Sequence, residues 1–325
     1  MTGTLTSVEV CAGAGGQALG LEQAGFEHLA LVDNDAHCCK TLRANRPSWN
    51  VIHSDLESFD GKPFEGVDLL SGGLPCPPFS VAGKQLGKND ERNLFPAFFR
   101  LIREVTPRAI LVENVRGFLD PVFEDYRQTL RQQFTALGYE CDWKLLQASD
   151  FGVSQLRPRV AIVAMPLGQL RHFAFPDQII SPEPIGSLLH DLMSKHGWKG
   201  ATAWANAADK IAPTIVGGSK KHGGPDLGPT RARRAWAELG VEGRTIADRE
   251  PESDFEGMPR LTVRMVARVQ GFPDDWVFTG KKTPAYRQVG NAFPPPVAYG
   301  LGKALAHAIR QSQGKRHSPR LKASA

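Results

Sequence analysis

The alternation of short apolar segments with amphipathic segments over residues 1–165 constrains the fold of this chain more than any other feature. Segments typical of strands occupy residues 6–10, 28–35, 51–54, 67–73, 109–115 and 159–165. Segments typical of helices lie between them at 16–25, 37–46, 94–105 and 126–138. Strands that alternate with helices favour a doubly wound, mostly parallel sheet, so we expect an α/β fold.

The pattern changes after residue 165. Residues 166–260 are rich in Gly, Pro and short polar runs, and the stretch GGSKKHGGPDLGP (217–229) is typical of a loop. Regular apolar patterns return at 261–272 and at 294–310. We therefore expect a larger α/β domain with a smaller, irregular insertion before its last helix.

Composition narrows the class of protein. The chain is 41% hydrophobic and 22% charged, which is ordinary for a soluble globular protein. It contains no apolar run of the roughly 20 residues that a membrane span needs, and its first residues show no secretory pattern. We therefore expect no membrane partner. Its five cysteines are an odd number and include no CxxC pair, so we expect no metal site and a reducing, cytoplasmic setting.

The net charge of +5 is distributed unevenly along the chain. Residues 1–165 carry 16 Lys+Arg against 20 Asp+Glu, whereas residues 261–325 carry 11 against 2. Between them, residues 210–234 hold six basic side chains and one acid, Asp226. Such segregation indicates a polyanionic partner, although a solvated basic tail accounts for part of the excess equally well.

A glycine-rich turn follows the first expected strand, in VEVCAGAGGQALG (8–20). Gly13, Gly15 and Ala18 satisfy the GxGxxA pattern, in which the backbone approaches a cofactor at the N-terminus of a helix. Asp33 lies 20 residues beyond Gly13, where an acid that binds a ribose is expected. This pattern favours an adenosine-containing cofactor and leaves NAD and S-adenosylmethionine both open. A tight turn without a ligand is the alternative.

Three polar groups are expected at the carboxyl ends of apolar strands, the edge at which open α/β sheets bind ligands. They are Asp55, the loop GGLPCPPFS (72–80) with its single Cys76, and the pair Glu113–Asn114. The prolines stiffen the loop around the thiol, which suggests a nucleophile; a proline-rich turn is the alternative. Glu113 interrupts an apolar run, so we expect a raised pKa and a proton donor, or else a carboxylate paired with an arginine or a helix N-terminus.

Two arginines alternate in QLRPRV (155–160), where the last expected strand of the first half begins. Arg157 and Arg159 are two residues apart, so their side chains project to the same side of a strand. Two adjacent guanidinium groups suit phosphate or carbonyl oxygens. A pair of surface salt bridges is the alternative.

Six segments of the chain resemble, in this order, the motif series of the cytosine-5 DNA methyltransferases of bacterial restriction–modification type. They are VEVCAGAGG, GGLPCPPFS, ENV, QLRPR, LTVRMVARVQGFPDDW and YRQVGNAFPPPV, and they span nearly the whole chain outside residues 166–260. Two positions depart from the family pattern. Pro77 stands where the family usually has Gln after the catalytic cysteine, and Cys11 replaces an aromatic residue expected against the cofactor. Neither departure removes a group that the chemistry requires.

The resemblance implies a Rossmann-like fold that binds S-adenosylmethionine. It also implies that the Cys76 thiolate adds to carbon 6 of cytosine, while Glu113 donates a proton to ring nitrogen 3. The implied catalytic set is Cys76, Glu113, Asn114, Arg157 and Arg159, with the two arginines on the base carbonyl and the adjacent phosphate. The implied cofactor set is Cys11, Ala12, Gly13, Ala14, Gly15 and Gly16 in the glycine loop, Asp33 on the ribose with Asn34 beside it, Asp55 near the adenine with Leu56 beside it, Gly73 and Pro75 at the methyl group, and Asn291 and Ala292 from the far end of the chain.

The implied substrate is duplex DNA whose target base is rotated out of the helix. Residues 80–94 are expected to close over the DNA as a lid, in which Ser80, Lys84, Lys88 and Arg92 contact it. Residues 173–285 are expected to form the target-recognition domain, and its basic residues Lys220, Lys221, Arg231, Arg233 and Arg234 to meet the groove or backbone. Residues 1–172 with 286–312 then form the catalytic domain, and 313–325 a basic, disordered tail. We expect a monomer, with a cognate restriction endonuclease as a further partner.

Three other functions are weighed against this hypothesis. An NAD-dependent oxidoreductase with a thiol nucleophile explains the glycine turn and Asp33, but leaves Glu113, Asn114 and the two arginines without a purpose. A cytosine-5 methyltransferase acting on transfer RNA uses the same catalytic parts, and the long insertion favours duplex DNA over it. A non-catalytic DNA-binding relative is disfavoured because Cys76, Glu113 and both arginines are present.

Overall fold

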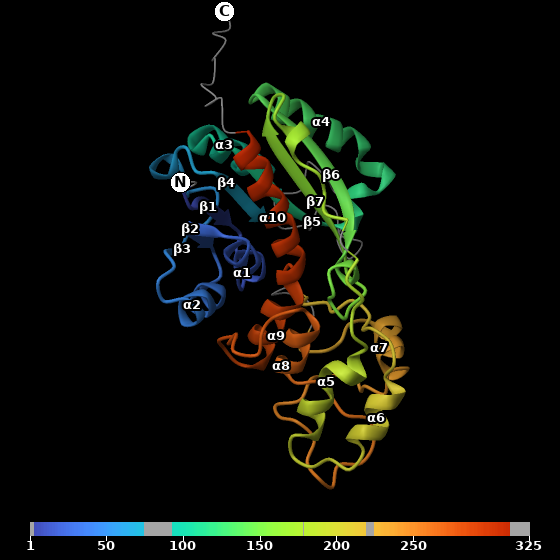
Figure 1. The fold of residues 1–325 in the computed structure, drawn as a ribbon. Helices are drawn as coiled ribbons and strands as arrows, with labels where there is room; N and C mark the ends of the chain where they lie inside the picture. The colour runs from blue at the N-terminus through green and yellow to red at the C-terminus, as the bar shows by residue number, and fades with distance from the viewer. Residues whose placement is uncertain (1–2, 75–92, 178, 219–223, 313–325) are drawn as a thin grey trace, which may run out of the picture.

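The computed structural model describes residues 3–74, 93–177, 179–218 and 224–312, and these are called the described residues. A seven-stranded sheet forms the centre of one lobe, and a helical region extends beyond the carboxyl edge of that sheet (Figure 1). The strands are β1 (Leu5–Val10), β2 (Phe26–Asp33), β3 (Val51–His53), β4 (Leu69–Gly73), β5 (Ala109–Val115), β6 (Tyr139–Gln147) and β7 (Pro158–Pro166).

The strand order is β3-β2-β1-β4-β5-β7-β6. The first five strands run parallel, and β7 pairs antiparallel with both β5 and β6. This arrangement confirms the doubly wound, mostly parallel α/β fold. Strand β6 was not predicted: it lies at the edge of the sheet, and most of its residues are partly or fully exposed, so it has no continuous apolar run.

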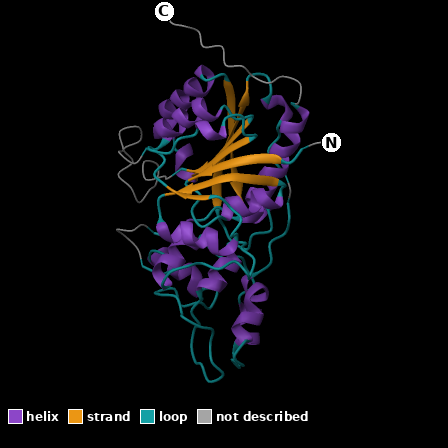
Figure 2. Cartoon of the chain, turned by 90° about the vertical axis from the view of Figure 1, so that its left-hand side faces the viewer, coloured by secondary structure: helices purple, strands orange, loops and turns teal. Residues whose placement is uncertain are grey.

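Helices cover both faces of the sheet (Figure 2). Alternate residues of the strands point to opposite faces and enter two separate apolar cores. One core is completed by α3 (Phe95–Val105) and α4 (Glu124–Ala136), and the other by α1 (Gly16–Gln23) and α10 (Pro295–Gln311). Helix α2 (Ala36–Asn45) packs beside β2 and β3. Helix α10, the last helix among the described residues, therefore packs on the sheet.

The insertion is more regular than its composition suggests. It contains α5 (Ile185–Ser194), α6 (Ala201–Ala207), α7 (Thr230–Ala237) and α8 (Val263–Val269), and α9 (Lys282–Asn291) leads back to the sheet. Short 3₁₀ helices lie at Lys62–Phe64, Arg116–Leu119, Pro121–Phe123, Ala148–Asp150 and Leu170–His172. The insertion helices surround a third apolar core built on Trp204, Trp236 and Tyr286. Helices α5, α6 and α7 are short and are stabilised by this core, which is why the sequence pattern did not show them, whereas α8 falls within the regular pattern expected at 261–272.

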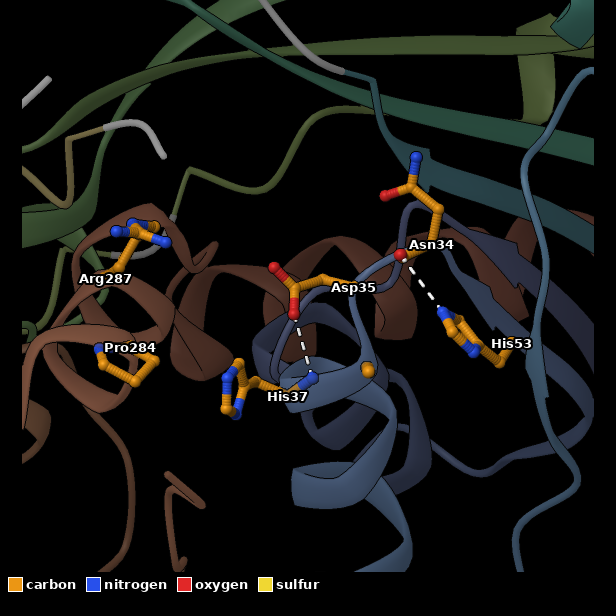
Figure 3. A pocket seen from close by; sticks show the side chains of 7 residues that line it. Asn34, Asp35, His37, His53, Pro284 and Arg287 are labelled. Atoms are coloured by element: carbon orange, nitrogen blue, oxygen red, sulfur yellow. Dashed lines mark hydrogen bonds between the residues drawn. The ribbon is translucent and has the colours of Figure 1, made fainter. Parts of the chain in front are cut away.

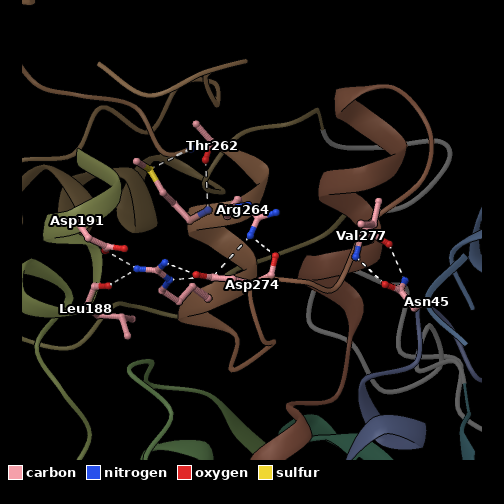
Figure 4. A network of polar contacts seen from close by, with 9 residues as sticks. Asn45, Leu188, Asp191, Thr262, Arg264, Asp274 and Val277 are labelled. Atoms are coloured by element: carbon pink, nitrogen blue, oxygen red, sulfur yellow. Dashed lines mark hydrogen bonds and ion pairs between the residues drawn. The ribbon is translucent and has the colours of Figure 1, made fainter. Parts of the chain in front are cut away.

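Polar contacts join the insertion helices to one another and to the sheet domain (Figure 4). Arg268 on α8 donates to the carbonyl of Leu188 and pairs with Asp191 on α5 and with Asp274. Asn45, at the end of α2, exchanges two hydrogen bonds with the backbone of Val277. The expected boundary between residues 285 and 286 falls inside α9, whose Tyr286 packs in the core of the insertion.

Membrane spans and metal clusters are both absent from the described residues. No helix there is long and apolar enough to cross a membrane. No group of three or more His, Cys, Asp or Glu side chains in that part of the chain could hold a metal ion.

Candidate active site

The candidate site lies where the order of strands reverses. The chain runs from β1 outward through β2 to β3, and β4 then returns to the other side of β1. A crevice at the carboxyl ends of the strands is expected at this switch point, and ligands of open α/β sheets bind there. The loop after β1 holds Cys11–Gly15, and the loop after β4 begins at Leu74 and leads to Cys76.

The loop after β1 is a tight turn held by Asp33. Gly13 and Gly15 have φ angles of 54° and 87°, in the left-handed region that favours glycine. Cys11 also has a positive φ, of 50°, which strains a side chain other than glycine. The amide of Gly13 donates to Asp33 Oδ2 at 2.8 Å, so the acid at the end of β2 fixes the turn. The backbone N–H groups at the start of α1 are then presented at the switch point.

A second group of polar side chains lies at the ends of β2 and β3. Asp33 Oδ1 accepts a hydrogen bond from the amide of Asp35 at 2.7 Å. Asn34 Nδ2 donates to Asp55 Oδ2 at 3.0 Å, and Leu56 beside it is buried. The amide of Glu57 and the Asn34 side chain lower the pKa of Asp55, which is therefore a carboxylate at neutral pH. The predicted ribose and adenine residues are thus neighbours in space.

An open cavity of about 520 Å³ adjoins these residues (Figure 3). Asn34, Asp35 and His53 come from the sheet side, where His53 Nε2 lies 3.2 Å from the carbonyl oxygen of Asn34. Pro284 and Arg287 come from α9 on the opposite side. The cavity therefore lies between the sheet domain and the returning chain.

Gly73 lies between the loop after β1 and the carboxyl group of Glu113. It is the last residue of β4, and it pairs in register with Glu113 of β5. A Cβ added to Gly73 would lie 3.4 Å from the carbonyl oxygen of Cys11 and 3.7 Å from Glu113 Oε2. The chain that continues to Cys76 therefore leaves the sheet between the glycine turn and Glu113.

Glu113 forms a buried ion pair with Arg159. Arg159 Nε lies 2.7 Å from Glu113 Oε1, and both side chains are almost fully buried. Burial raises the pKa of Glu113, while the nearby charges of Arg159 and then Arg157 oppose the rise. Both alternatives left open by the sequence are therefore present at once: the carboxyl is desolvated, and it has an arginine partner. The neighbouring Asn114 is also buried, and its Oδ1 accepts from the amide of Val115.

Arg157 has different partners from Arg159. Its side chain is completely buried, and its terminal nitrogens donate to the carbonyl oxygens of Ile215, Gly290 and Ala292. The guanidinium groups of Arg157 and Arg159 are near enough to interact electrostatically. In this structure, however, only Arg159 contacts the candidate catalytic acid.

Sequence reasoning missed a buried polar cluster behind this edge. Glu9 on β1 pairs in register with Ser71 on β4, and Gln17 on α1 is buried against them. Glu9 Oε2, Ser71 Oγ and both polar atoms of the Gln17 side chain have no hydrogen-bond partner among the described residues. Burial, the largest influence, raises the pKa of Glu9 to about 8. The only signal in the sequence was a glutamate inside an apolar strand.

The remaining predicted residues fall into two groups. Pro75, Cys76, Ser80, Lys84, Lys88, Arg92, Lys220 and Lys221 lie outside the described residues. Of the others, Arg231 and Arg234 are exposed on α7, and Arg233 is partly buried. Asn291 is exposed at the end of α9, and its Nδ2 donates to the carbonyl of Gly218.

A sheet of this order, with a glycine turn at its switch point, defines a class of α/β enzymes that bind an adenosine-containing cofactor at that edge. Within that class, residues 5–307 match the family of C-5 cytosine-specific DNA methylases, and the chain belongs to this family. The resemblance predicted from the motifs is thereby confirmed. Because the family is defined by methylation of DNA, the NAD and RNA alternatives are not favoured.

Relatives of high identity share this activity. The chain is 54% identical over 310 residues to the Type II methyltransferase M.NgoMIV of Neisseria gonorrhoeae, covering 94% of this chain and 98% of the relative. It is 52% identical over 312 residues to the Type II methyltransferase M.NaeI of Lentzea aerocolonigenes, covering 94% and 76%. The chain is thus similar to modification enzymes over nearly its whole length.

Solved structures support the fold. A prophage-encoded E. coli protein described as a DNA modification methyltransferase superposes with a TM-score of 0.67 at 23% identity, covering 94% of this chain and 99% of that chain. DNMT2 of Spodoptera frugiperda gives 0.65 at 18% identity, covering 93% and 99%. At these identities the likeness concerns the fold alone.

Proposed function

We propose that this chain methylates carbon 5 of a cytosine within one duplex DNA sequence, with S-adenosylmethionine as methyl donor and Cys76 as nucleophile. The observation that carries the proposal is the position of Gly73, in contact range of both the glycine turn and Glu113. Cys76 follows Gly73 by three residues in the sequence. The loop with the nucleophile therefore starts between the cofactor turn and the acid.

The residues at the switch point fit S-adenosylmethionine. A Cβ added to Gly13 would meet no atom within 4 Å, so the turn faces open space. Asp33 and Asp55 offer carboxylate oxygens for ribose hydroxyls and an adenine amino group, and the start of α1 offers backbone N–H groups for a carboxylate. Asn291 approaches from the end of α9. When bound, S-adenosylmethionine supplies an electrophilic sulfonium methyl group.

Cys76 has to act as the nucleophile because carbon 5 of cytosine does not react while the ring is aromatic. Addition of the Cys76 thiolate to carbon 6 interrupts the aromaticity and makes carbon 5 an enamine carbon that can attack a methyl group. Loss of the carbon 5 proton and departure of Cys76 then restore the ring. Thiols suit this role because the thiolate is strongly nucleophilic near neutral pH and is also a good leaving group.

Glu113 and Arg159 act on different atoms of the cytosine base. As the thiolate adds, negative charge develops at ring nitrogen 3, and a protonated Glu113 can donate there. Burial raises the pKa of Glu113 and so favours its protonated form. The charge of Arg159 lowers that pKa and makes the rise smaller. Arg159 retains donors beyond Nε that can reach the base carbonyl.

The insertion supplies the proposed DNA contacts. Arg231 and Arg234 lie exposed on α7, within the segment whose basic side chains outnumber its acids. Cations that are exposed to solvent can neutralise phosphates without a large desolvation cost. We assign the chain to the modification side of a restriction–modification pair, acting in the cytoplasm as a monomer. Its partner endonuclease would cleave the same sequence.

The proposal is tested in two stages. First, conversion sequencing of DNA from expressing cells should show 5-methylcytosine at one recurring sequence. Second, a duplex with 5-fluorocytosine at that position should trap a covalent adduct in the presence of S-adenosylmethionine, because fluorine cannot leave as the proton does. Peptide mass spectrometry should place the adduct on Cys76.

Matched controls make the result decisive. Cys38→Ala should still form the adduct, whereas Cys76→Ala should not. Methylation found only in transfer RNA, or an adduct on another cysteine, would contradict the proposal.

A further inference from the structure

Arg157 connects segments that are far apart in the sequence. Nη1 donates to the carbonyl of Ile215 at 2.8 Å, and Nη2 donates to those of Gly290 at 2.7 Å and Ala292 at 3.0 Å. No solvent reaches the side chain. A buried arginine is costly unless its donors are satisfied. Both terminal nitrogens are satisfied by these carbonyls, while Nε has no hydrogen-bond partner among the described residues.

The carbonyls at the end of α9 need such a donor. The last turn of a helix leaves its carbonyl oxygens without partners from the same helix, and it carries a partial negative charge. Helix α9 ends at Asn291, and the following residues 294–296 are prolines, which have no backbone N–H to offer. The planar guanidinium of Arg157 bonds the carbonyls on both sides of Asn291. Its Nη2 bonds both of these carbonyls while Nη1 bonds that of Ile215, and a lysine, with a single nitrogen, could not hold all three with the same geometry.

Two buried glutamines extend the same network. Gln155 Oε1 accepts from the amide of Ile215 at 2.8 Å, and its Nε2 donates to Gln270 Oε1. Gln270 Nε2 donates to the carbonyl of Ala292 at 2.6 Å. The residues before β7, the end of α8 and the end of α9 are therefore fastened to one another. Each side chain in this set is completely buried.

A segment from the middle of the insertion, at residues 217–218, packs directly on the end of α9. A Cβ added to Gly217 would lie 2.4 Å from Asn291 Oδ1, and one added to Gly290 would lie 2.4 Å from Gly217 Cα. Asn291 Nδ2 also donates to the carbonyl of Gly218. On the other side, a Cβ added to Gly16 at the start of α1 would lie 2.1 Å from the carbonyl oxygen of Phe293. Residues 290–293 thus lie between the cofactor turn and the insertion.

We propose that Arg157 is a positioning residue, which holds residues 290–292 so that this segment stays against the start of α1 and so that the insertion keeps its place beside it. In this assignment Arg159 alone reaches the base. The inference rests on the proposed function, because it takes Asn291 to be a cofactor residue. It replaces the expectation that the Arg157 guanidinium itself contacts the base carbonyl or a phosphate.

The test compares Arg157→Lys with Arg127→Lys. Arg127 is a matched control, since it is also buried and also donates to backbone carbonyls, those of Phe118 and Asp120, away from the candidate site. Binding of S-adenosylhomocysteine is measured by calorimetry without DNA, and DNA affinity by a salt titration. We expect Arg157→Lys to weaken cofactor binding about tenfold, with DNA affinity within about twofold and the salt slope unchanged. Arg127→Lys should lower the melting temperature without changing cofactor affinity.

A double-mutant cycle tests whether Arg157 acts through Asn291. Asn291→Ala should weaken cofactor binding by itself, and Arg157→Lys should then add little to it. Additive losses would show that Arg157 acts by another route. Gln270→Leu serves if Arg157→Lys fails to fold. It removes the bond to the Ala292 carbonyl and the bond from Gln155 Nε2 but leaves Arg157 in place, and we expect about a threefold loss of cofactor affinity.

The opposite result is equally clear. If Arg157→Lys leaves cofactor affinity unchanged while DNA binding weakens and the salt slope falls by about one, Arg157 contacts a phosphate and the inference is wrong. Unchanged cofactor affinity in Gln270→Leu would also overturn it. Failure of the proposed function would be visible earlier, because the wild-type chain would then bind no S-adenosylhomocysteine.

Discussion

The carboxyl edge of the sheet and the surface of α7 use charged side chains in opposite ways. At the edge, Glu113 and Arg159 are desolvated and paired at 2.7 Å. On α7, Arg231 and Arg234 are exposed to solvent. A desolvated pair can tune a proton affinity, whereas solvated cations act over a distance and respond to salt. We therefore expect changes at the edge to alter turnover, and changes on α7 to alter DNA affinity.

The largest expected effect tests the edge at its nucleophile. Cys76→Ser should lower methyl transfer by at least about 10⁴-fold, because a hydroxyl is a far weaker nucleophile than a thiolate. DNA affinity should remain close to that of the wild type. Methyl transfer is followed with a labelled donor, and DNA binding by a gel-shift assay. Substantial turnover by this variant would remove Cys76 from the mechanism.

The second prediction concerns Glu113. Glu113→Gln should lower turnover by about 10²–10⁴-fold, since an amide cannot supply the proton to ring nitrogen 3, and cofactor affinity should be unchanged. In the wild type, burial raises the pKa of Glu113, so turnover at saturating substrate should fall as the pH rises through that pKa.

The test is to measure kcat as a function of pH for the wild type and for Glu113→Gln. The high-pH decline should be absent from the residual activity of Glu113→Gln. Loss of cofactor affinity instead would move Glu113 to the other pocket.

The third prediction concerns Glu9, a second buried carboxyl group on the same sheet as Glu113, to which no role in the reaction is assigned. Burial raises the pKa of Glu9 to about 8 from 4.5, so the folded protein binds a proton there that the unfolded chain releases. The stability of the wild type should therefore fall as the pH rises from about 4.5 to 8. Glu9→Gln cannot ionise, so between pH 5 and 8 it should gain about 3 kcal/mol relative to the wild type. Urea unfolding at several pH values measures this gain, and parallel pH curves would contradict it.

The smallest expected effect belongs to α7. Arg231→Ala or Arg234→Ala should each flatten the salt dependence of DNA binding by about one unit of slope, equally on target and non-target duplexes. If one of them reads a guanine edge, its loss should instead cost about 1–3 kcal/mol on the target alone. Turnover at saturating DNA should stay unchanged in both cases. Variants that are neutral in both assays would place recognition elsewhere in residues 173–260.

Much of the sheet domain could be predicted because its signals are local. The apolar strands, the glycine turn and Asp33 each follow from residues close together in the chain, and the predicted strands at residues 28–35 and 109–115 appear as β2 and β5. The helices α5, α6 and α7 were not predicted, because they are short and are stabilised by a tertiary core around Trp204 and Trp236. The edge strand β6 was missed for a related reason, since its half-exposed residues lack a continuous apolar run.

The sequence by itself determined the fold class and the family, because both depend on residue type and order. Tertiary structure alone decided how two arginines of one signature are used. Arg157 and Arg159 are equivalent as a pattern, since their spacing predicts the same side of a strand for both. One meets the carboxylate of Glu113, and the other meets the carbonyls at the end of a helix, of which Gly290 is 133 residues away in the chain. Partners that distant follow from packing, which no local spacing encodes.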